Sequence, residues 1–462
     1  MTAPASSVVA EGLAGARPSL GPVAAARLGE VCSRADDPPS VAVAGRVSAG
    51  KSTLVNAVVG RRGAPTDAGE CTQVVARFRF GSAEHVVVHG RDGETAVRRL
   101  GDDGRIPSSL GRPVAEIDHI EVFLANRRLR SVEIVDTPGV SSASGAGQRT
   151  ERYLGLDAAS TDAVGRADAV LYLLTHTGRT DEATDLTSFG AASGGRADAA
   201  IGVLGKADLV AGGDPAAAEE LAARLSDRLH GAVRTVLPLW TLVAEAVSCG
   251  RLSEADARAV AAIAELDAAT RELLLADASL FVDLDAPVDR ASRARLQDVL
   301  GHVGAVRAVA LAGEGLRGAA PLVQALDELS GRSRLDQAMD ELEERAEVLR
   351  AARMLEAAEV IAYGAADAGG LRDVVEQLRS RPELHVLDET TALDDLRSGR
   401  ARLRPDVVDR AVATLVQPAS VADLDAAIDH WREVEVLCGD PVGERVARTI
   451  GRTLVLRRRG IR

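Results

Sequence analysis

Lysine is almost absent from this sequence. Lys51 and Lys206 are the only lysines among 462 residues, and arginine supplies the rest of the 55 basic side chains. Arginine carries the same charge, but its planar guanidinium cannot replace a compact ammonium where space is tight. The two lysines therefore point to positions at which the shape of the side chain matters, and both lie in short loops that follow apolar runs.

Aromatic residues, paired cysteines and long apolar runs are also scarce. Aromatic side chains make up 2% of the residues. The four cysteines lie far apart without a C-x-x-C pair, which argues against a disulfide framework or a zinc site and suits a reducing compartment. There is no apolar run of about 18 residues, and the amino terminus lacks the basic and apolar regions of a secretion signal. We therefore expect a cytoplasmic protein that is soluble or peripheral.

The charge balance excludes a general affinity for nucleic acids. The formal net charge is -13, so no overall positive field attracts phosphate backbones. A chain of this length is sufficient for two or three domains with their own cores.

One loop has the pattern G-x-x-x-x-G-K-[ST]. It follows the apolar run Val41–Ala44 and precedes a helical pattern that begins at Thr53. Glycines at both ends allow backbone N–H groups to point inward, and the helix dipole adds positive potential. We expect the loop and Thr53 to bind the phosphates of a nucleotide, with Lys51 near the β- and γ-phosphates and Ser52 on Mg²⁺. The loop consists of Gly45, Arg46, Val47, Ser48, Ala49, Gly50, Lys51 and Ser52.

Three further segments follow apolar runs and complete a nucleotide site. Asp136 opens the sequence DTPG, where its carboxylate is placed to support Mg²⁺ and the Gly139 N–H to meet the γ-phosphate. Lys206 and Asp208 lie in the sequence GKAD, and the carboxylate of Asp208 can accept two hydrogen bonds from guanine that adenine cannot offer. Trp240 follows the last apolar run, and we expect its loop to present backbone N–H groups near the base.

The chain divides into three regions by pattern. Residues 40–247 alternate apolar runs with helical stretches, which predicts a P-loop α/β domain with a mixed, mostly parallel sheet. Residues 248–462 predict an all-helical arm or bundle, and residues 1–39 a mobile start followed by a helix that packs on this arm. The longest apolar stripe predicts one long helix. It consists of Leu335, Met339, Leu342, Ala346, Leu349 and Ala352.

The motifs GRVSAGKS, GECT, DTPG and KAD, followed by a helical half, resemble those of the bacterial dynamin-like GTPases. Within this family, the segment Thr66–Thr72 is similar to switch I of the actinobacterial branch of isoniazid-inducible proteins. The helical sequence around residues 330–350 also resembles that branch. The resemblance covers roughly residues 20–365.

The resemblance implies a GTPase that uses GTP, GDP and Mg²⁺ and acts in membrane remodelling or septation at the inner face of the plasma membrane. Its G domains would pair as a homodimer, or in a hetero-assembly with a related dynamin-like protein. By this resemblance Ser48 organises a charge-compensating cation, Thr72 holds Mg²⁺ and the attacking water, and Gly139 contacts that water. Lys51 would act with them in catalysis.

Two departures from the family pattern leave an alternative open. Val47 stands where eukaryotic dynamins have a catalytic glutamine, and Gly205 replaces the Asn or Thr that normally braces the base loop to the phosphate-binding loop. The alternative is a nucleotide-gated scaffold that binds GTP and GDP with negligible hydrolysis. A ribosome-associated GTPase is disfavoured, because no basic RNA-binding domain follows the G domain.

Two smaller groups of residues carry open interpretations. His85 and His89 lie on the same face of a predicted strand. They are either a pair of metal ligands or simply exposed histidines, and the sequence shows no third ligand near them. The carboxyl-terminal arginines are a contact for anionic lipid or a solvated chain end. They are Arg452, Arg457, Arg458, Arg459 and Arg462.

Overall fold

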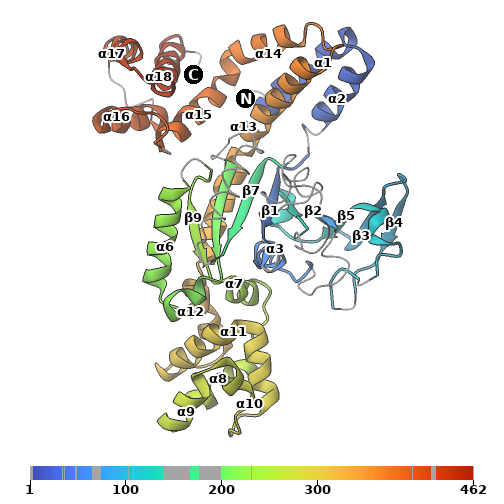
Figure 1. The fold of residues 1–462 in the computed structure, drawn as a ribbon, viewed down its shortest axis with the longest axis vertical. Coiled ribbons are helices and arrows are strands. Elements are labelled where there is room, and N and C mark those ends of the chain that lie inside the picture. Colours follow the sequence, from blue (N-terminus) through green and yellow to red (C-terminus); the bar gives the residue numbers. More distant parts are fainter. Residues whose placement is uncertain are drawn as a thin grey trace, which may run out of the picture. The chain divides into compact units, whose positions relative to one another are not determined.

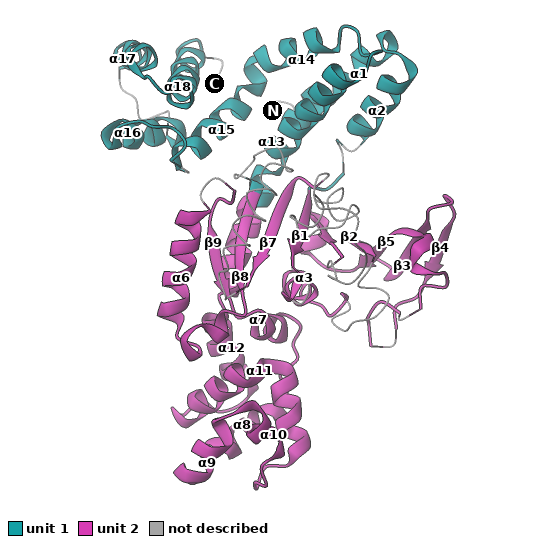
Figure 2. Cartoon of the chain, viewed as in Figure 1, with its two compact units in different colours: residues 1–39, 197–199, 342–462 teal, residues 40–196, 200–341 magenta. Residues whose placement is uncertain are grey.

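The computed structural model describes most of the chain. The described residues are 4–33, 35, 37–46, 49–64, 74–101, 103–107, 109–138, 167–175, 199–229, 232–397, 399–417 and 423–460. They form two compact units (Figure 2). Unit 1 contains residues 1–39, 197–199 and 342–462, and unit 2 contains residues 40–196 and 200–341.

Unit 2 is built on one mixed sheet with the strand order β4-β3-β5-β2-β6-β1-β7-β8-β9 (Figure 1). The strands are β1 (Ser40–Gly45), β2 (Val75–Phe80), β3 (His85–Gly90), β4 (Thr95–Arg98), β5 (Ile117–Leu124), β6 (Glu133–Asp136), β7 (Ala169–Leu174), β8 (Ala200–Gly205) and β9 (Val236–Leu239).

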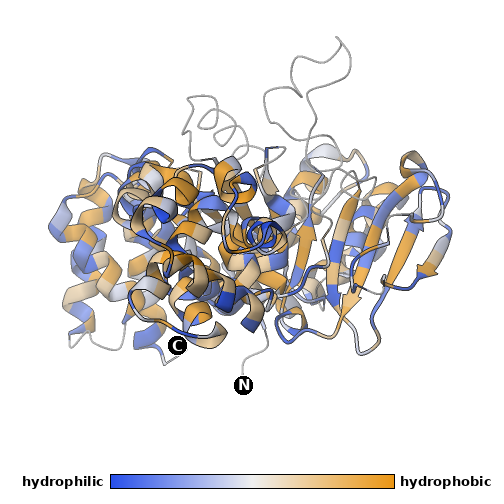
Figure 3. Cartoon of the chain, turned by 90° about the horizontal axis from the view of Figure 1, so that it is seen from below, coloured by the Kyte–Doolittle hydropathy of each residue, from blue (hydrophilic) through white to orange (hydrophobic). Residues whose placement is uncertain are grey.

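The two halves of this sheet differ in strand direction and burial. Strands β6, β1, β7, β8 and β9 are mutually parallel. Strands β1, β7 and β8 are buried along their whole length, as expected for parallel strands covered on both faces. Strand β2 joins the other half antiparallel to β6, and β3 alternates buried and half-buried residues. Hydrophilic and hydrophobic segments both occur along these strands (Figure 3).

The helices of unit 2 cover this sheet and extend the unit. They are α3 (Lys51–Val59), α6 (Pro215–Arg228), α7 (Thr241–Ser248), α8 (Glu254–Ala264), α9 (Ala268–Leu275), α10 (Ala278–Asp283), α11 (Arg290–Gly313) and α12 (Ala319–Ser330). One apolar cluster joins the sheet residue Tyr172 to Val243 of α7, Leu296 of α11 and Leu322 of α12. Phe281 lies fully buried in the same cluster, as expected for a core residue.

Residues 248–341 therefore belong to the same compact unit as the mixed sheet. This differs from the sequence-based division, which ends the first domain at residue 247 and assigns all later helices to one arm. The reason is packing, because these helices complete the apolar core of the sheet instead of forming a core of their own. The boundary falls within α13 (Arg332–Gly364), the predicted long helix, at residues 341 and 342.

Unit 1 is helical. Its other helices are α1 (Ala5–Ala16), α2 (Pro22–Ser33), α14 (Leu371–Ser380), α15 (His385–Arg397), α16 (Pro405–Val416), α17 (Leu424–Leu437) and α18 (Pro441–Arg458). Trp431 is buried in a cluster formed by α15 to α18. The N-terminal helix α2 lies in one apolar cluster with the second half of α13, as the sequence predicts.

The start of the chain differs from the mobile segment that its composition suggests. Residues 5–16 form helix α1, in which Val9 and Leu13 are fully buried. Their spacing of four residues places them on one face of the helix, which packs with α14. Gly12 lies so close to Leu378 of α14 that a Cβ atom would be 2.5 Å from its Cδ2 atom.

The predicted fold class is confirmed, with a mixed, mostly parallel sheet followed by helices. The apolar runs before the four predicted nucleotide-site motifs form strands β1, β6, β8 and β9. Among the described residues, no helix combines the length and the apolar character needed to cross a membrane.

Candidate functional site: the carboxyl edge of the parallel strands

The loops that carry the predicted nucleotide motifs emerge from one edge of the sheet. Because β1, β6, β8 and β9 run parallel, their carboxyl ends lie along the same edge. Register places Val43 of β1 beside Asp136 of β6, and Gly205 of β8 beside Leu239 of β9. Ligands of open parallel sheets bind at this edge.

Two glycines shape the loop between β1 and α3. Gly45 has φ 146°, and a Cβ atom there would lie 2.7 Å from the carbonyl oxygen of Leu173. Gly50 has φ 102° and is the N-cap residue of α3. Positive φ values favour glycine. The loop therefore turns back on the strand and delivers the N-terminus of α3 to the carboxyl edge.

Lys51 is the first residue of α3 and is buried, with 7% of its surface exposed. Its Nζ atom donates hydrogen bonds to the carbonyl oxygens of Gly45 at 3.0 Å and Arg46 at 3.1 Å. The ammonium is thus held inside the curve of the loop by the backbone of the loop itself. A guanidinium group is larger and planar, which explains why lysine is retained here.

Asp136 lies at the end of β6 and is also buried. The hydroxyl of Ser52 donates a hydrogen bond to its Oδ2 atom at 3.1 Å. Burial raises the pKa of Asp136 to about 6, although the charge of Lys51 and the hydrogen bond from Ser52 act to lower it. The next residue, Thr137, fixes this strand end by donating its hydroxyl to the carbonyl oxygen of Val43 at 2.8 Å.

The arrangement of Ser52 and Asp136 fits a magnesium ion. The Oδ1 atom of Asp136 is buried and has no hydrogen-bond partner within the described part of the chain. A buried carboxylate oxygen without a partner is unfavourable, and a divalent cation with its bound water removes that cost. Hydroxyl and carboxylate oxygens are ligands that Mg²⁺ prefers.

The loop predicted to recognise the base follows β8. Lys206 adopts a left-handed conformation with φ 55°, which is rare for a residue with a side chain and occurs mainly where the surroundings impose it. Its backbone N–H donates to the hydroxyl of Thr241 at 3.2 Å. Thr241 is buried and is the first residue of α7. Thr241 therefore connects the loop after β8 to the loop after β9.

The same threonine explains Gly205. A Cβ atom at position 205 would lie 2.7 Å from the Cδ1 atom of Leu173 and 3.3 Å from the hydroxyl oxygen of Thr241. The space for a side chain at this position is therefore already occupied. Asp208 follows in the short helix Ala207–Gly212 and is half-buried.

Trp240 differs from the prediction. Its backbone N–H donates to the carbonyl oxygen of Ser330 at 2.9 Å, and its side chain is 3% exposed within the core of unit 2. The backbone N–H is therefore engaged by the end of α12 and is not directed at a base. The residue that contributes to the base loop is its neighbour Thr241, which was not among the predicted site residues.

Several predicted site residues lie outside the described residues. They are Val47, Ser48, Thr72 and Gly139. The loop residues Arg46 and Ala49, as well as Thr53 in α3, are described, and they lie at the same edge as Lys51 because they adjoin it in sequence.

A buried hydrogen-bond network that the sequence did not reveal holds Ala64, the last described residue before segment 65–73. The Asn56 Oδ1 atom accepts a hydrogen bond from the Ala64 N–H at 2.8 Å, and its Nδ2 atom donates to Glu245 of α7 at 2.8 Å. Glu245 is 1% exposed and forms an ion pair with Arg251 at 3.2 Å. This network ties the end of α3 to α7, which begins at Thr241.

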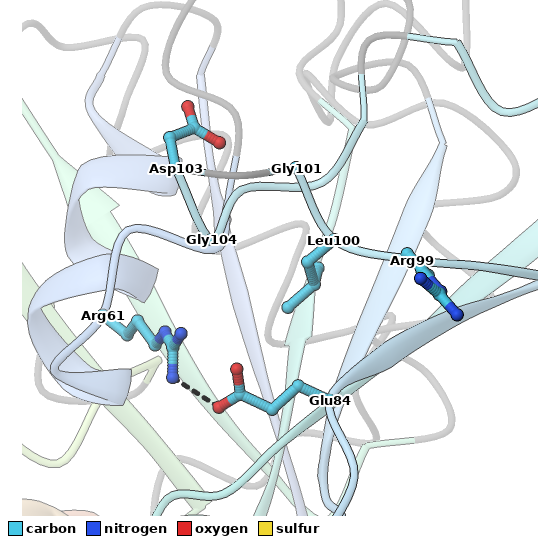
Figure 4. Close-up of a pocket in the computed structure, with 7 residues that line it drawn as sticks. All are labelled: Arg61, Glu84, Arg99, Leu100, Gly101, Asp103 and Gly104. Atoms are coloured by element: carbon cyan, nitrogen blue, oxygen red, sulfur yellow. Dashed lines mark hydrogen bonds and ion pairs between the residues drawn. The ribbon is translucent and has the colours of Figure 1, made fainter.

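A pocket of about 480 Å³ lies in a different part of unit 2 (Figure 4). It lies between the residues that follow α3 and those that follow β4, and its Arg61 side chain pairs with Glu84. These residues are not at the carboxyl edge of the parallel strands, so we do not assign the pocket to the nucleotide site. Its lining residues are Arg61, Glu84, Arg99, Leu100, Gly101, Asp103 and Gly104.

Part of the chain is similar to known proteins. Residues 41–207 match the model of the dynamin family. The chain is 36% identical over 299 residues to the isoniazid-induced protein IniC from two strains of Mycobacterium tuberculosis, and the alignment covers 63% of this chain. The matched region spans 60% of the length of these relatives.

Two solved structures of an oligomerised bacterial dynamin pair, described as a mechanism for the long-range sensing and tethering of membranes, also align with the chain. Both have a TM-score of 0.36. One is 13% identical and the alignment covers 99% of this chain and 76% of the other, whereas the second is 12% identical with 96% and 88% covered.

Proposed function

Because residues 41–207 match the dynamin family and the chain is a bacterial dynamin-like protein, we propose that it binds GTP with Mg²⁺ at the carboxyl edge of its sheet and hydrolyses it. The observation that supports this most strongly is the group formed by Lys51, Ser52 and Asp136. It combines a buried ammonium, a hydroxyl and a buried carboxylate with an unpartnered oxygen.

The phosphates are bound by the loop between β1 and α3. Backbone N–H groups at the start of α3 and the helix dipole favour an anion there. The ammonium of Lys51 already lies within this loop, so it supplies positive charge without a large rearrangement of the backbone. Ser52 and Asp136 would hold Mg²⁺, which supplies charge neutralisation at the β- and γ-phosphates when bound.

Guanine is recognised at the other end of the site. Asp208 supplies the carboxylate that accepts hydrogen bonds from the guanine edge, and Lys206 lies in the same loop. Thr241 holds the backbone of Lys206 by the hydrogen bond to its N–H. This contact anchors the base loop to the start of α7, so the loop is held by a residue other than the one at position 205.

Water activation rests on the resemblance to the family. Thr72 is proposed to hold Mg²⁺ and the attacking water, and Ser48 and Gly139 to contact the catalytic cation and the water. Asn56 supports this step indirectly, because it fixes Ala64 directly before the segment that contains Thr72.

We also propose that the G domains pair across the nucleotide and that nucleotide state controls membrane remodelling or septation. Two of the carboxyl-terminal arginines bind groups of the protein itself, which makes them weaker candidates for contact with anionic lipid than the sequence suggests. Arg452 donates to the carbonyl oxygen of Ser380 at 2.7 Å, and Arg458 pairs with Asp425 at 2.8 Å. Val436 and Leu437 at the end of α17 are 81% and 74% exposed and are better candidates for lipid contact.

The scaffold function remains a second proposal because Val47 stands in the place of the catalytic glutamine. Calorimetric titration with GTP and GDP, combined with single-turnover phosphate release, separates the two proposals. Phosphate release that depends on protein concentration supports a GTPase activated by pairing. Tight binding without release supports the scaffold, and no binding of either nucleotide in magnesium buffer refutes both.

The membrane part is tested separately with anionic liposomes. GTP turnover is measured with and without vesicles, and vesicle binding is compared between the parent protein and a Val436→Asp, Leu437→Asp double variant. Turnover and sedimentation that do not respond to vesicles would refute membrane coupling and leave nucleotide binding intact.

A further inference from the structure

Strands β3 and β5 bring together two histidines and a glutamate that are distant in sequence. The strands are antiparallel neighbours (Figure 1), and their register places His89 of β3 directly opposite His119 of β5. Glu121 is two residues further along β5. Side chains alternate between the two faces of a strand, so all three project from one face of the sheet.

The three side chains are close enough to share one cation. One ligand atom from each lies within 4.8 Å of the others, and within the described part of the chain this is the group of three that meets that condition. The rings of His89 and His119 stack with their centroids 4.3 Å apart, and the Nε2 atom of His89 lies 3.0 Å from the Oε2 atom of Glu121. All three side chains are half-buried.

Neighbouring charged groups orient these side chains. The Nδ1 atom of His119 lies 2.8 Å from the carboxylate of Asp118, which favours the tautomer with a proton on Nδ1 and leaves the Nε2 lone pair for a metal. Arg79 donates to the Oε1 atom of Glu121 at 2.9 Å and leaves Oε2 on the side of His89. A carboxylate behind a histidine is the usual outer support of a protein-bound metal.

The guanidinium groups on the same face are balanced by a second acid. Arg77 pairs with Glu133 at 2.5 Å, and Arg79 lies 3.4 Å from the same carboxylate. Glu133 is buried, so its negative charge faces these two arginines in an environment of weak screening. Because Glu133 neutralises part of their charge, Arg77 and Arg79 repel a bound cation less strongly.

We propose that His89, His119 and Glu121 bind one divalent transition metal ion, with zinc as the best match. Two imidazole nitrogens and one carboxylate oxygen form a donor set that zinc accepts, and water supplies the fourth ligand. Bonds of about 2.0 Å require donor atoms about 3.3 Å apart. Because an imidazole binds a metal in the plane of its ring, the two stacked rings must also rotate out of their parallel arrangement to bind one ion. The ion cross-links β3 and β5 and is independent of the nucleotide site.

The sequence analysis named His89 as a possible metal ligand but paired it with His85 instead of His119 and Glu121. His85 and His89 share a strand face, but His85 stacks on Phe123 with centroids 4.6 Å apart and is not in the group of three. His85 is therefore a matched control, since it lies on the same strand and face and also stacks on an aromatic ring of β5.

The test uses the full chain without an affinity tag, freed of metal by chelation and assayed without nucleotide. Zinc binding is measured by calorimetry, and Co²⁺ is added as a spectroscopic probe of coordination. We expect one saturable site and a tetrahedral Co²⁺ spectrum without a thiolate charge-transfer band. His89→Ala, His119→Ala and Glu121→Gln should each weaken zinc binding at least about 100-fold, and Asp118→Asn about 10-fold, whereas His85→Ala should not change it.

A folding check and a functional check keep the outcome interpretable. Zinc should raise the thermal midpoint of the parent and of His85→Ala but not of His119→Ala, and all variants should retain the circular dichroism spectrum of the parent. Lys51→Ala should bind zinc normally. The proposal is overturned if no saturable site is found, if His119→Ala binds zinc like the parent, or if His85→Ala loses binding equally.

Discussion

Replacing Asp136 by asparagine is expected to stabilise the nucleotide-free protein while it removes the proposed magnesium site. Burial raises the pKa of Asp136 from 3.8 to about 6, so the folded protein favours the neutral form of this side chain. Asparagine has a similar shape, keeps an acceptor for the hydroxyl of Ser52 and carries no charge. The same burial that holds the carboxylate ready for a cation thus makes the protein less stable without one.

The magnitude follows from the two pKa values. Each pKa unit corresponds to about 1.4 kcal/mol, so ionisation of Asp136 lowers the free energy of unfolding by about 3 kcal/mol at pH 8. The folded pKa is the higher one. The destabilisation is therefore absent below the unfolded value of 3.8, grows as the pH rises and is complete above about 6. At pH 4.5 the same relation gives about 1 kcal/mol.

The assay is guanidinium denaturation in EDTA at pH 8 and pH 4.5. The sequence has two tryptophans, and in a Trp431→Phe background the fluorescence of Trp240 reports on unit 2 alone. We expect Asp136→Asn to be more stable than its parent by up to about 3 kcal/mol at pH 8 and by about 1 kcal/mol at pH 4.5. Addition of Mg²⁺ and GDP should stabilise the parent and not the variant, because ligands stabilise the state that binds them.

The control is Glu220→Gln, which also removes one negative charge. Glu220 is an exposed partner of Arg224 on α6, so its loss should change stability by less than about 1 kcal/mol at either pH. The reasoning fails if Asp136→Asn is less stable than its parent at pH 8, or if the difference between them is the same at both pH values.

Three further substitutions test the nucleotide site. Lys51→Arg should lose GTP binding nearly as completely as Lys51→Ala in calorimetry, although arginine serves elsewhere in this chain, and binding by Lys51→Arg would show that charge alone suffices. Thr241→Val should leave the Lys206 N–H without a partner and weaken GDP binding about 10-fold, a loss of about 1–2 kcal/mol, whereas Thr241→Ser should bind normally. Asn56→Ala should lower the free energy of unfolding by about 2–4 kcal/mol and slow GTP turnover, because Ala64 and Glu245 both lose a buried partner. Denaturation measures the change in stability, and phosphate release measures the change in turnover.

The local parts of the nucleotide site were predictable because adjacent residues build them. The loop from Gly45 to Ser52 is specified by its own glycines and by the strand before it, and the structure shows the positive φ values that those glycines permit. The position of Asp136 at the end of β6 could be predicted for a similar reason. It ends an apolar run, and the ends of parallel strands meet at one edge.

Features that depend on distant partners were not predictable. The apolar residues Val9 and Leu13 have no visible role until α14 packs against them. The compact unit of the sheet extends to residue 341, because the helices after residue 248 have the composition of an arm but share the core of the sheet. His119 and Glu121 became candidate ligands only through the register of β3 and β5.

Gly205 shows how a position that weakens a prediction in the sequence can be neutral in the structure. A missing side chain suggests a looser base loop if only the motif is considered. The structure places Thr241 from the next strand connection within 3.3 Å of where that side chain would begin, and its hydroxyl accepts the Lys206 N–H. A residue from another part of the chain therefore holds this loop, so Gly205 and Thr241 must be considered together. Thr241 thus compensates for part of what Gly205 removes, and single-turnover phosphate release tests the effect of the other departure, Val47, directly.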